Sequence, residues 1–261
     1  MARPRKKEII LSLISVLSLT CFFVFWQLTV DFHILPKGLL ASPTEVVKLF
    51  FFKLSNTAPD GVALGTHIYV SLKEALLGYI IALVIGIPLG LAMGWFKVVE
   101  GLVRPIFEMV RPIPPVAWIP LAIFWFGIGI TSKAFIIFFA ALVASVINSF
   151  TGVRQTNPTF IRMARSYGAS DWEIFWKICI PSALPMVFGG LQVALAGAWT
   201  SLVAAEMIAA DSGLGYLITI GRRLMRVDVV MLGMVLVGLT GVLISIIVSK
   251  VERRLVAGVR R

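Results

Sequence analysis

The feature that most constrains this chain is a series of apolar runs long enough to cross a lipid bilayer. The first run, residues 9–30, holds 22 residues and would reach about 33 Å as a helix, enough to cross the hydrocarbon core. Charged residues make up 14% of the 261 residues and apolar ones 59%, whereas a soluble domain has about 25% charged residues. This composition argues against a soluble enzyme and against a disordered chain. It predicts an all-α, polytopic membrane helical bundle.

The apolar runs predict six transmembrane helices, over residues 9–30, 68–95, 116–126, 134–151, 185–209 and 229–249. The third run is too short alone, so we expect it to extend back through Arg111-Pro-Ile-Pro-Pro115, since prolines at membrane depth are tolerated when neighbouring helices satisfy the freed carbonyls. A signal peptide also starts with basic residues, but its apolar core is shorter, so residues 9–30 are expected to stay as an uncleaved span. We expect an exposed linker at 31–67 with a short amphipathic helix near 44–53.

The expected domain organisation follows from these spans. Residues 1–67 are the N-terminus, first span and linker, residues 68–251 are a core with a cytoplasmic loop at 154–181, and residues 252–261 are a basic tail. Six spans put both termini on one side, and that side receives 16 of the 24 Lys and Arg residues, against 8 on the other. Because cytoplasmic loops carry the excess of Lys and Arg, both termini are expected in the cytoplasm.

The chain contains few cysteines and histidines, and it lacks a phosphate-binding motif, so several kinds of site have no support in the sequence. Two cysteines, Cys21 and Cys179, give no disulfide framework, and two histidines without a Cys/His cluster give no support for a zinc or haem site. The stretch from Gly127 to Lys133 has the wrong spacing for a phosphate-binding loop. If the protein uses ATP, another chain must therefore bind it. The net charge of +11 does not lie on a polar domain, so nucleic acid is not an expected partner.

Small residues recur every four positions in two of the expected spans. In lipid, such ridges let helix backbones approach closely. We therefore expect these two spans to pack against other helices through their small residues, which are Gly78, Ala82, Gly86, Gly90 and Gly94 in one span and Gly190, Ala194 and Ala198 in the other.

The loop at 154–181 is predicted to hold two short helices joined at a glycine. Asn157-Pro158 is typical of a helix start, and Gly168 is suited to a left-handed helix end. Ser170-Asp-Trp-Glu173 fits a capping box that opens a second helix over 171–178, which we expect to end before Pro181. A defined, aromatic-rich loop of this kind is typical of a docking site, although an ordinary pair of interfacial helices is the alternative.

This loop resembles the EAA loop of ABC importer permeases, whose pattern is E-A-A, three residues, G, nine residues, I-x-L-P. Aligning the glycine at Gly168 puts the second alanine at Ala164, the isoleucine at Ile178 and the proline at Pro181. Two positions depart from the pattern, since Arg162 and Met163 replace the family's Glu and first Ala. The resemblance implies a loop that couples to an ATPase through Ala164, Arg165, Gly168, Ala169, Ser170, Asp171, Trp172, Ile178 and Pro181.

Further segments extend the resemblance over most of the chain. They are similar to the permease subfamily that serves taurine, alkanesulfonates, nitrate and bicarbonate, and they are Ser71-Leu-Lys-Glu-Ala-Leu-Leu-Gly-Tyr79, Gly86-Ile-Pro-Leu-Gly90, the stretch Arg111–Pro120, Trp125-Phe-Gly-Ile-Gly129 and Leu202-Val-Ala-Ala-Glu-Met207. The resemblance implies a type I (MetI-like) ABC importer permease in the bacterial inner membrane. It also implies a homodimer, two cytoplasmic ATPase subunits that hold ATP and Mg²⁺, and a periplasmic or lipid-anchored solute-binding protein, with no cofactor in this chain.

Charges on the expected outer side leave alternatives open. Glu206 lies in an apolar run, where ionisable groups are costly and either find a partner or line a cavity. A structural ion pair and a pore or gate role are equally compatible with the sequence. Arg222 and Arg223 lie against the charge bias, either as a surface that contacts the binding protein or as an electropositive funnel for an anionic solute.

The sequence favours an importer permease, with taurine or an alkanesulfonate as the expected solute, over two other classes of protein. A secondary transporter acting alone would be expected to contain internal repeats and broken midplane helices, and no convincing repeat is found. A membrane scaffold without transport would leave the loop around Gly168 unexplained.

Overall fold

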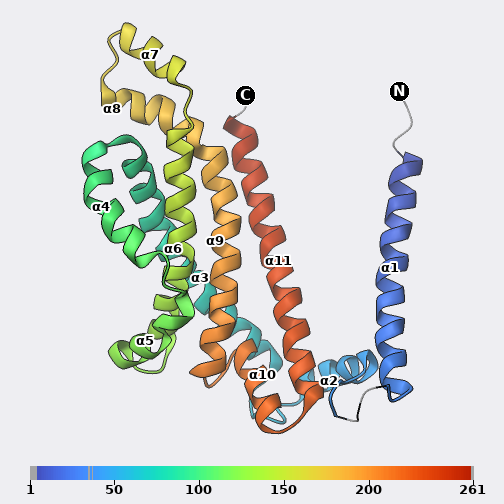
Figure 1. The fold of residues 1–261 in the computed structure, drawn as a ribbon. Coiled ribbons are helices and arrows are strands. Elements are labelled where there is room, and N and C mark those ends of the chain that lie inside the picture. Colours follow the sequence, from blue (N-terminus) through green and yellow to red (C-terminus); the bar gives the residue numbers. More distant parts are fainter. Residues whose placement is uncertain (1–4, 35, 37, 260–261) are drawn as a thin grey trace. The chain divides into compact units, whose positions relative to one another are not determined.

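The computed structural model describes residues 5–34, 36 and 38–259, with side chains described from residue 11 to residue 250 apart from 12, 35 and 37. These residues form helices joined by short turns (Figure 1). The chain divides into two compact units, one of Met1–Gly65 with Leu217–Leu236 and one of Thr66–Tyr216 with Val237–Arg261. The expected boundaries at residues 67 and 251 therefore stay predictions. The basic residues near the N-terminus and the whole of the 252–261 tail fall outside the described side chains.

The first unit contains α1 (Arg5–Asp31) and α2 (Pro43–Ser55). Trp26 of α1 donates a hydrogen bond from Nε1 to the carbonyl of Ala41, 3.0 Å away, which fixes the segment that enters α2. The bounds of α2 confirm the amphipathic helix that was expected near 44–53. The expectation of an exposed linker is wrong in one respect, because the Lys53 side chain is buried and its Nζ lies 2.5 Å from Asp60.

The core of the second unit is built from α3 (Leu64–Trp95), α6 (Ile130–Arg154) and α9 (Ile180–Ile208). The small-residue ridge of α3 faces α6, as expected. A Cβ at Gly78 would lie 2.7 Å from the carbonyl oxygen of Ala134, and one at Gly94 would lie 2.7 Å from Cβ of Val153. The second ridge is also confirmed, since Gly190 meets Asn148 of α6 and both alanines of that ridge are fully buried. Small residues thus set the spacing of the core helices.

The fifth span is longer than expected. The second helix of the 154–181 loop does not end before Pro181, because α8 (Asp171–Ile174) runs through a π-helical turn, η2 (Phe175–Cys179), directly into α9. A proline ring in a regular helix clashes with the carbonyl four residues earlier. Here the amide of Ile180 bonds to the carbonyl of Phe175, and this wider turn accommodates Pro181. As a result, α8, η2 and α9 form one continuous helical stretch, Asp171–Ile208, which is long and apolar enough to cross a membrane.

The third span is broken at the proline-rich stretch. It consists of two pieces, α4 (Lys97–Val110) and the pair η1 (Pro115–Trp118) and α5 (Ile119–Phe126). The two pieces are bent by 84° at the turn between them. The described residues therefore contain five helices long and apolar enough to cross a membrane, or six when this bent pair is counted as one span. The remaining helices are α7 (Pro158–Ser166), α10 (Leu214–Arg223) and α11 (Val227–Val259).

Candidate functional site

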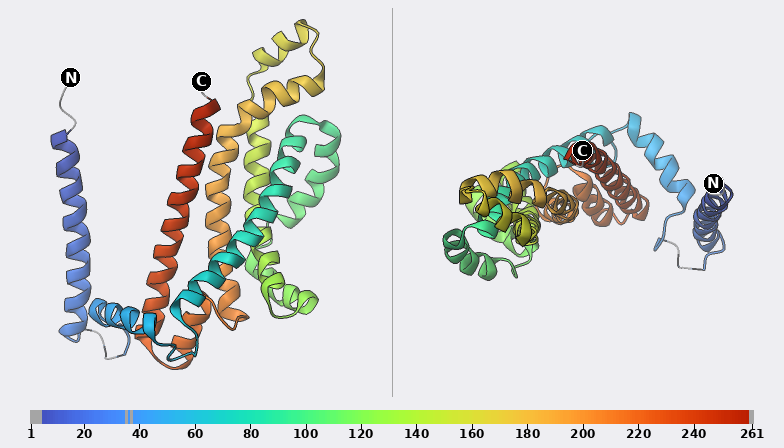
Figure 2. Two further views of the ribbon diagram at one scale, coloured as in Figure 1. Left: turned by 180° about the vertical axis from the view of Figure 1, so that it is seen from behind. Right: turned by 90° about the horizontal axis from the view of Figure 1, so that it is seen from above.

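The helix–glycine–helix loop lies at one end of the second unit and is closed by its own backbone (Figures 1 and 2). Gly168 has a φ of +79°, as its role as a left-handed helix stop requires. The amide of Ala169 bonds to the carbonyl of Ala164 and that of Gly168 to the carbonyl of Arg165, both at 3.0 Å. These two bonds satisfy the last carbonyls of α7 and fix the direction in which the chain leaves the helix.

Side chains lock both flanks of this elbow. Asn157 caps α7 by accepting the amide of Thr159 at 2.9 Å. Ser170 and Glu173 form the expected capping box, with the Ser170 hydroxyl accepting the Glu173 amide at 3.3 Å and the Glu173 carboxylate accepting the Ser170 amide at 3.1 Å. Arg165 then bridges the elbow to Asp171 at 3.0 Å. The loop is therefore a preformed shape.

The loop buries one face and exposes the other. Ile174, Phe175 and Cys179 pack into an apolar cluster with the ends of α6 and α9, so the loop is anchored to the bundle. The outward face is aromatic, and Tyr167 and Trp172 are 88% and 59% exposed. A cavity of about 440 Å³ lies beside this face, lined by Phe160, Met163, Ala164, Tyr167, Lys177, Ile178, Pro181 and Ser182. An exposed aromatic surface on a rigid support is typical of a docking site.

The structure brings eight of the nine predicted loop residues onto the elbow, its flanking helices or the η2 turn. Ala164 and Arg165 end α7, Gly168 and Ala169 form the elbow, and Ser170, Asp171 and Trp172 open α8. Ile178 lies in η2 and, like the ninth residue, Pro181 at the start of α9, lines the cavity. Their role in coupling remains a proposal.

Glu206 lies at the opposite end of the second unit, in a buried polar network. Its side chain is 1% exposed and accepts two hydrogen bonds, from the Ser71 hydroxyl at 2.6 Å and from the Gly215 amide at 2.8 Å. Both of these donors are neutral groups, one from α3 and one from α10. The choice between a structural ion pair and a pore or gate role for Glu206 stays a prediction.

Three consecutive amides at the start of α10 are captured in this network. The Gly213 amide bonds to Nδ1 of His67 at 3.0 Å, the Leu214 amide to the Ser71 hydroxyl at 2.8 Å, and the Gly215 amide to Glu206. A helix start leaves its first amides without partners, so α3 and α9 together supply its cap. A Cβ at Gly213 would collide with the Glu206 carboxylate. Sequence reasoning missed His67 and Ser71, although their spacing of four residues puts both on one face of α3.

A second buried charge pair joins α3 to α6. Nζ of Lys133 lies 2.7 Å from Glu74, and the two side chains are 6% and 5% exposed. Lys133 is one of the 8 Lys and Arg residues that the charge count places on the side opposite the termini. The pairing joins residues 59 positions apart, so no local pattern in the sequence could predict it. Among the described residues, no cluster of His, Cys, Asp or Glu is suited to hold a metal ion.

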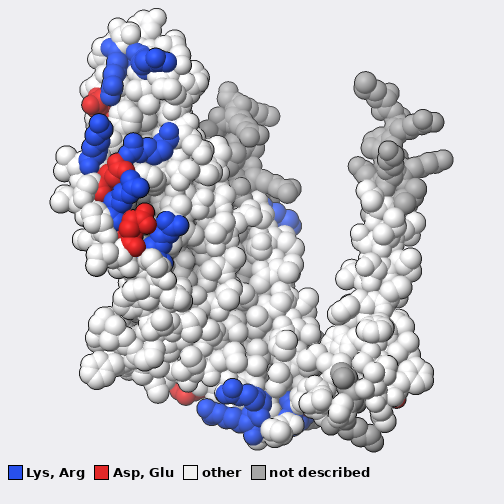
Figure 3. All heavy atoms as spheres, viewed as in Figure 1, with Lys and Arg blue, Asp and Glu red and all other residues white. Residues whose placement is uncertain are grey.

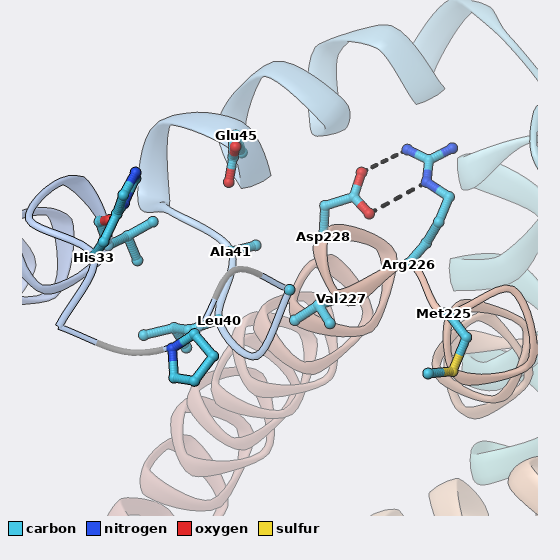
Figure 4. Close-up of a pocket in the computed structure, with 11 residues that line it drawn as sticks. His33, Leu40, Ala41, Glu45, Met225, Arg226, Val227 and Asp228 are labelled. Atoms are coloured by element: carbon cyan, nitrogen blue, oxygen red, sulfur yellow. Dashed lines mark hydrogen bonds and ion pairs between the residues drawn. The ribbon is translucent and has the colours of Figure 1, made fainter.

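Arg222 and Arg223 lie exposed in the last turn of α10, within the first unit. They do not line a cavity of about 500 Å³ in that unit (Figure 4). The arginine that does line it, Arg226, is held by Asp228 through two hydrogen bonds of 2.5 and 3.2 Å. The charge of Arg226 is therefore neutralised by Asp228. For Arg222 and Arg223, both alternatives stay open: a surface that contacts the binding protein, or an electropositive funnel for an anionic solute.

Comparison with known proteins decides the family. Residues 82–261 match the family of binding-protein-dependent transport system inner membrane components. The chain belongs to this family. It is 33% identical to the taurine transport system permease protein of Escherichia coli (strain K12), over 93% of this chain and 88% of that protein. It is 29% identical to the nitrate import permease protein of Synechocystis sp. (strain PCC 6803), over 96% of this chain and 94% of that protein.

A solved relative shows the same fold. The methionine ABC transporter in its inward-facing conformation superposes with a TM-score of 0.59 at 21% identity, over 76% of this chain and 96% of that chain. The predicted fold class, a type I importer permease, is confirmed. As a member of the inner membrane component family, this chain is a multi-pass permease subunit of an ABC importer and not an enzyme. ATP is hydrolysed in separate partner chains.

Proposed function

We propose that this permease carries a small anion into the cell, most specifically taurine or another alkanesulfonate. The support is the similarity to a taurine permease over 93% of this chain and 88% of that protein. Nitrate permeases are similar to this chain at comparable identity. Nitrate and bicarbonate are the alternative solutes. In such an importer a periplasmic or lipid-anchored binding protein selects the solute and delivers it, and the permease supplies the path.

Coupling to ATP hydrolysis is assigned to the loop around Gly168. The observation that carries this proposal is the rigid elbow with its exposed aromatic face, anchored to α6 and α9 by a buried apolar cluster. Because Asp171–Ile208 is one continuous stretch, a displacement of the loop is transmitted along α9 to the Glu206 network at the far end. Two ATPase subunits, each with its own ATP and Mg²⁺, would each engage the loop of one permease copy in a homodimer.

The orientation proposed is the one that the charge bias predicts, with both termini and the Gly168 loop in the cytoplasm. The Glu206 network then lies at the periplasmic end. Arg222 and Arg223 are assigned to docking of the binding protein, because arginine is enriched in protein interfaces and both side chains are exposed. A gate role for Glu206 acts through α10, whose first turn its carboxylate holds.

Deletion of this chain in its native cell tests the proposed solute. The deletion strain is expected to lose growth when taurine or an alkanesulfonate at low concentration is the sole sulfur source. Growth on sulfate is the control and should be unchanged, and a plasmid copy of the chain should restore growth on the sulfonate. Normal growth on sulfonates together with lost growth on nitrate would move the assignment to nitrate, and normal growth on every one of these anions would contradict the proposal.

A further inference from the structure

The helix α4 and the pair η1 and α5 together cross the whole depth of the second unit. Near the start of α4, Glu100 forms an ion pair with Arg154, the last residue of α6. On the other side of the bend, Ile119 and Ala122 pack with Ile136, close to the first turn of α6. The 18 residues between positions 136 and 154 of α6 span about 27 Å, close to the thickness of the hydrocarbon core. α4 therefore runs into the membrane from the end that carries the Gly168 loop.

Three faces of α4 have three different environments. One face is apolar and exposed, with Val98, Leu102, Ile106 and Met109 between 66% and 77% exposed. A second face is half-buried. The third face carries the charges, which follow one another at helical spacing as Lys97, Glu100, Arg104, Glu108 and, just past the helix end, Arg111. A helix surrounded by water would not expose its apolar face, and a helix surrounded by lipid would not expose the charged one.

The charged face continues to membrane depth. Arg104 pairs with Glu100 at 3.0 Å and Arg111 with Glu108 at 3.5 Å, so both ion pairs are local to the helix. The Arg111 and Glu108 side chains are nevertheless 48% and 50% exposed, although Arg111 lies about 21 Å along the helix from Lys97. Ionisable groups at such depth face a water-filled cavity or a partner. Figure 3 shows these charges as a column over α4, below the charges of α7 and α8.

A groove of about 570 Å³ follows this face and is lined by Lys97, Glu100, Gly101, Arg104, Pro105 and Glu108. The lining carries two cations, Lys97 and Arg104, against the carboxylates of Glu100 and Glu108. Arg111 and Arg154, which pair with these carboxylates, add two positive charges beside the groove. A net positive charge beside low-dielectric protein raises the local concentration of anions.

We propose that the charged face of α4 is one wall of a water-filled vestibule through which the anion passes to the cytoplasm, with Arg104 and Arg111 as its anion-attracting groups. This inference rests on the proposed function. The apolar face of α4 then contacts lipid, and the bend after Arg111 closes the deep end of the vestibule. The guanidinium of Arg111 offers five N–H donors, and its contact with Glu108 engages one of its nitrogens. A passing sulfonate or nitrate can therefore bind Arg111 without breaking the pair.

Cysteine accessibility tests this vestibule in the native membrane. Two adjacent pairs of positions compare the two faces at two depths, Gly101→Cys with Leu102→Cys, and Glu108→Cys with Met109→Cys, in a chain whose own Cys21 and Cys179 are replaced by Ala. A Cβ at Gly101 meets no atom within 4 Å, so this probe fits without disturbance. Freeze-thawed vesicles from cells that hold the whole importer, which admit reagent to both sides, are treated with an anionic methanethiosulfonate reagent that carries a sulfonate or with a cationic one that carries a trimethylammonium group.

Both charged-face cysteines are expected to react at least about tenfold faster than their apolar neighbours, because thiolate forms in water and not in lipid. At Gly101→Cys the anionic reagent should outpace the cationic one by about tenfold at low salt. Adding Arg104→Gln and Arg111→Gln should remove this preference while both reagents still react. Unreactive charged-face cysteines would overturn the proposal in favour of a surface covered by a second copy. Equal rates for the two reagents would show a water path without anion preference, which also overturns it.

The reactivity pattern does not depend on which solute the importer carries. If growth on sulfonates and nitrate is unaffected by deletion while the pattern is as expected, the vestibule stands and the proposed solute fails. If growth is lost while the charged face is unreactive, the proposed function stands and this inference fails.

Discussion

Replacing Glu74 with Leu is expected to destabilise the protein by about 3–5 kcal/mol, because it leaves the Lys133 ammonium buried without its counter-charge. The two side chains are 5% and 6% exposed and lie 2.7 Å apart, and they join α3 to the first turn of α6. Unfolding of the purified protein in a fixed detergent mixture, followed by circular dichroism, measures the change.

A double-mutant cycle separates the pair from general damage to the core. Lys133→Leu alone is expected to be similarly destabilising, while the double variant Glu74→Leu with Lys133→Leu should recover most of the loss, since an apolar pair of similar volume replaces a buried ion pair at little cost. Lys177→Leu is the matched control. Its ion pair with Glu173 is largely exposed, so its loss should change stability by less than about 1 kcal/mol. Strictly additive effects of the two core substitutions would contradict the coupling.

The second large effect is expected at the elbow. Gly168→Val should reduce solute uptake by about tenfold or more, because a left-handed conformation costs a residue with a side chain about 1–2 kcal/mol, and a β-branched residue more. A Cβ at Gly168 meets no atom within 4 Å, so the penalty comes from the backbone conformation and not from a collision. Uptake of radiolabelled solute by cells with equal amounts of each variant in the membrane measures it.

Two variants control this experiment. Gly168→Asn is expected to keep most of the uptake, because asparagine tolerates the left-handed region. Gly189→Val, at an exposed helical glycine where a Cβ also meets no atom, should leave uptake near normal. If Gly168→Val transports as well as Gly189→Val, the rigid elbow is not needed for coupling.

Much of this architecture is predictable from the sequence because it depends on local signals. Apolar length gives the spans, and small residues four positions apart identify the faces of α3 and α9 that meet α6. Capping residues and Gly168 predict where both short helices of the loop begin and where the first one ends, since each acts on its own neighbours. The type of fold and the shape of the loop therefore follow from short-range rules.

The sequence does not predict contacts between distant positions or the paths of broken helices. Glu206, Ser71 and His67 meet at the start of α10 across more than 130 positions, and a lone carboxylate in an apolar run does not reveal whether its partner is a cation or an amide. The proline-rich stretch after Arg111 signals a break but not its 84° bend. The π-helical turn before Pro181 was not predicted for a similar reason. A proline in a sequence suggests that a helix ends, but the helix can also continue when the preceding turn widens.

The central claim, that this chain is the path of an ATP-driven importer and has no energy source of its own, is tested most directly in proteoliposomes. The permease is reconstituted with or without its ATPase partner, and accumulation of radiolabelled taurine is measured with the binding protein and ATP supplied or withheld. Accumulation is expected only when the ATPase, ATP and the binding protein are all present. Accumulation by the permease alone, driven by an ion gradient without ATP, would contradict the account and identify a secondary transporter.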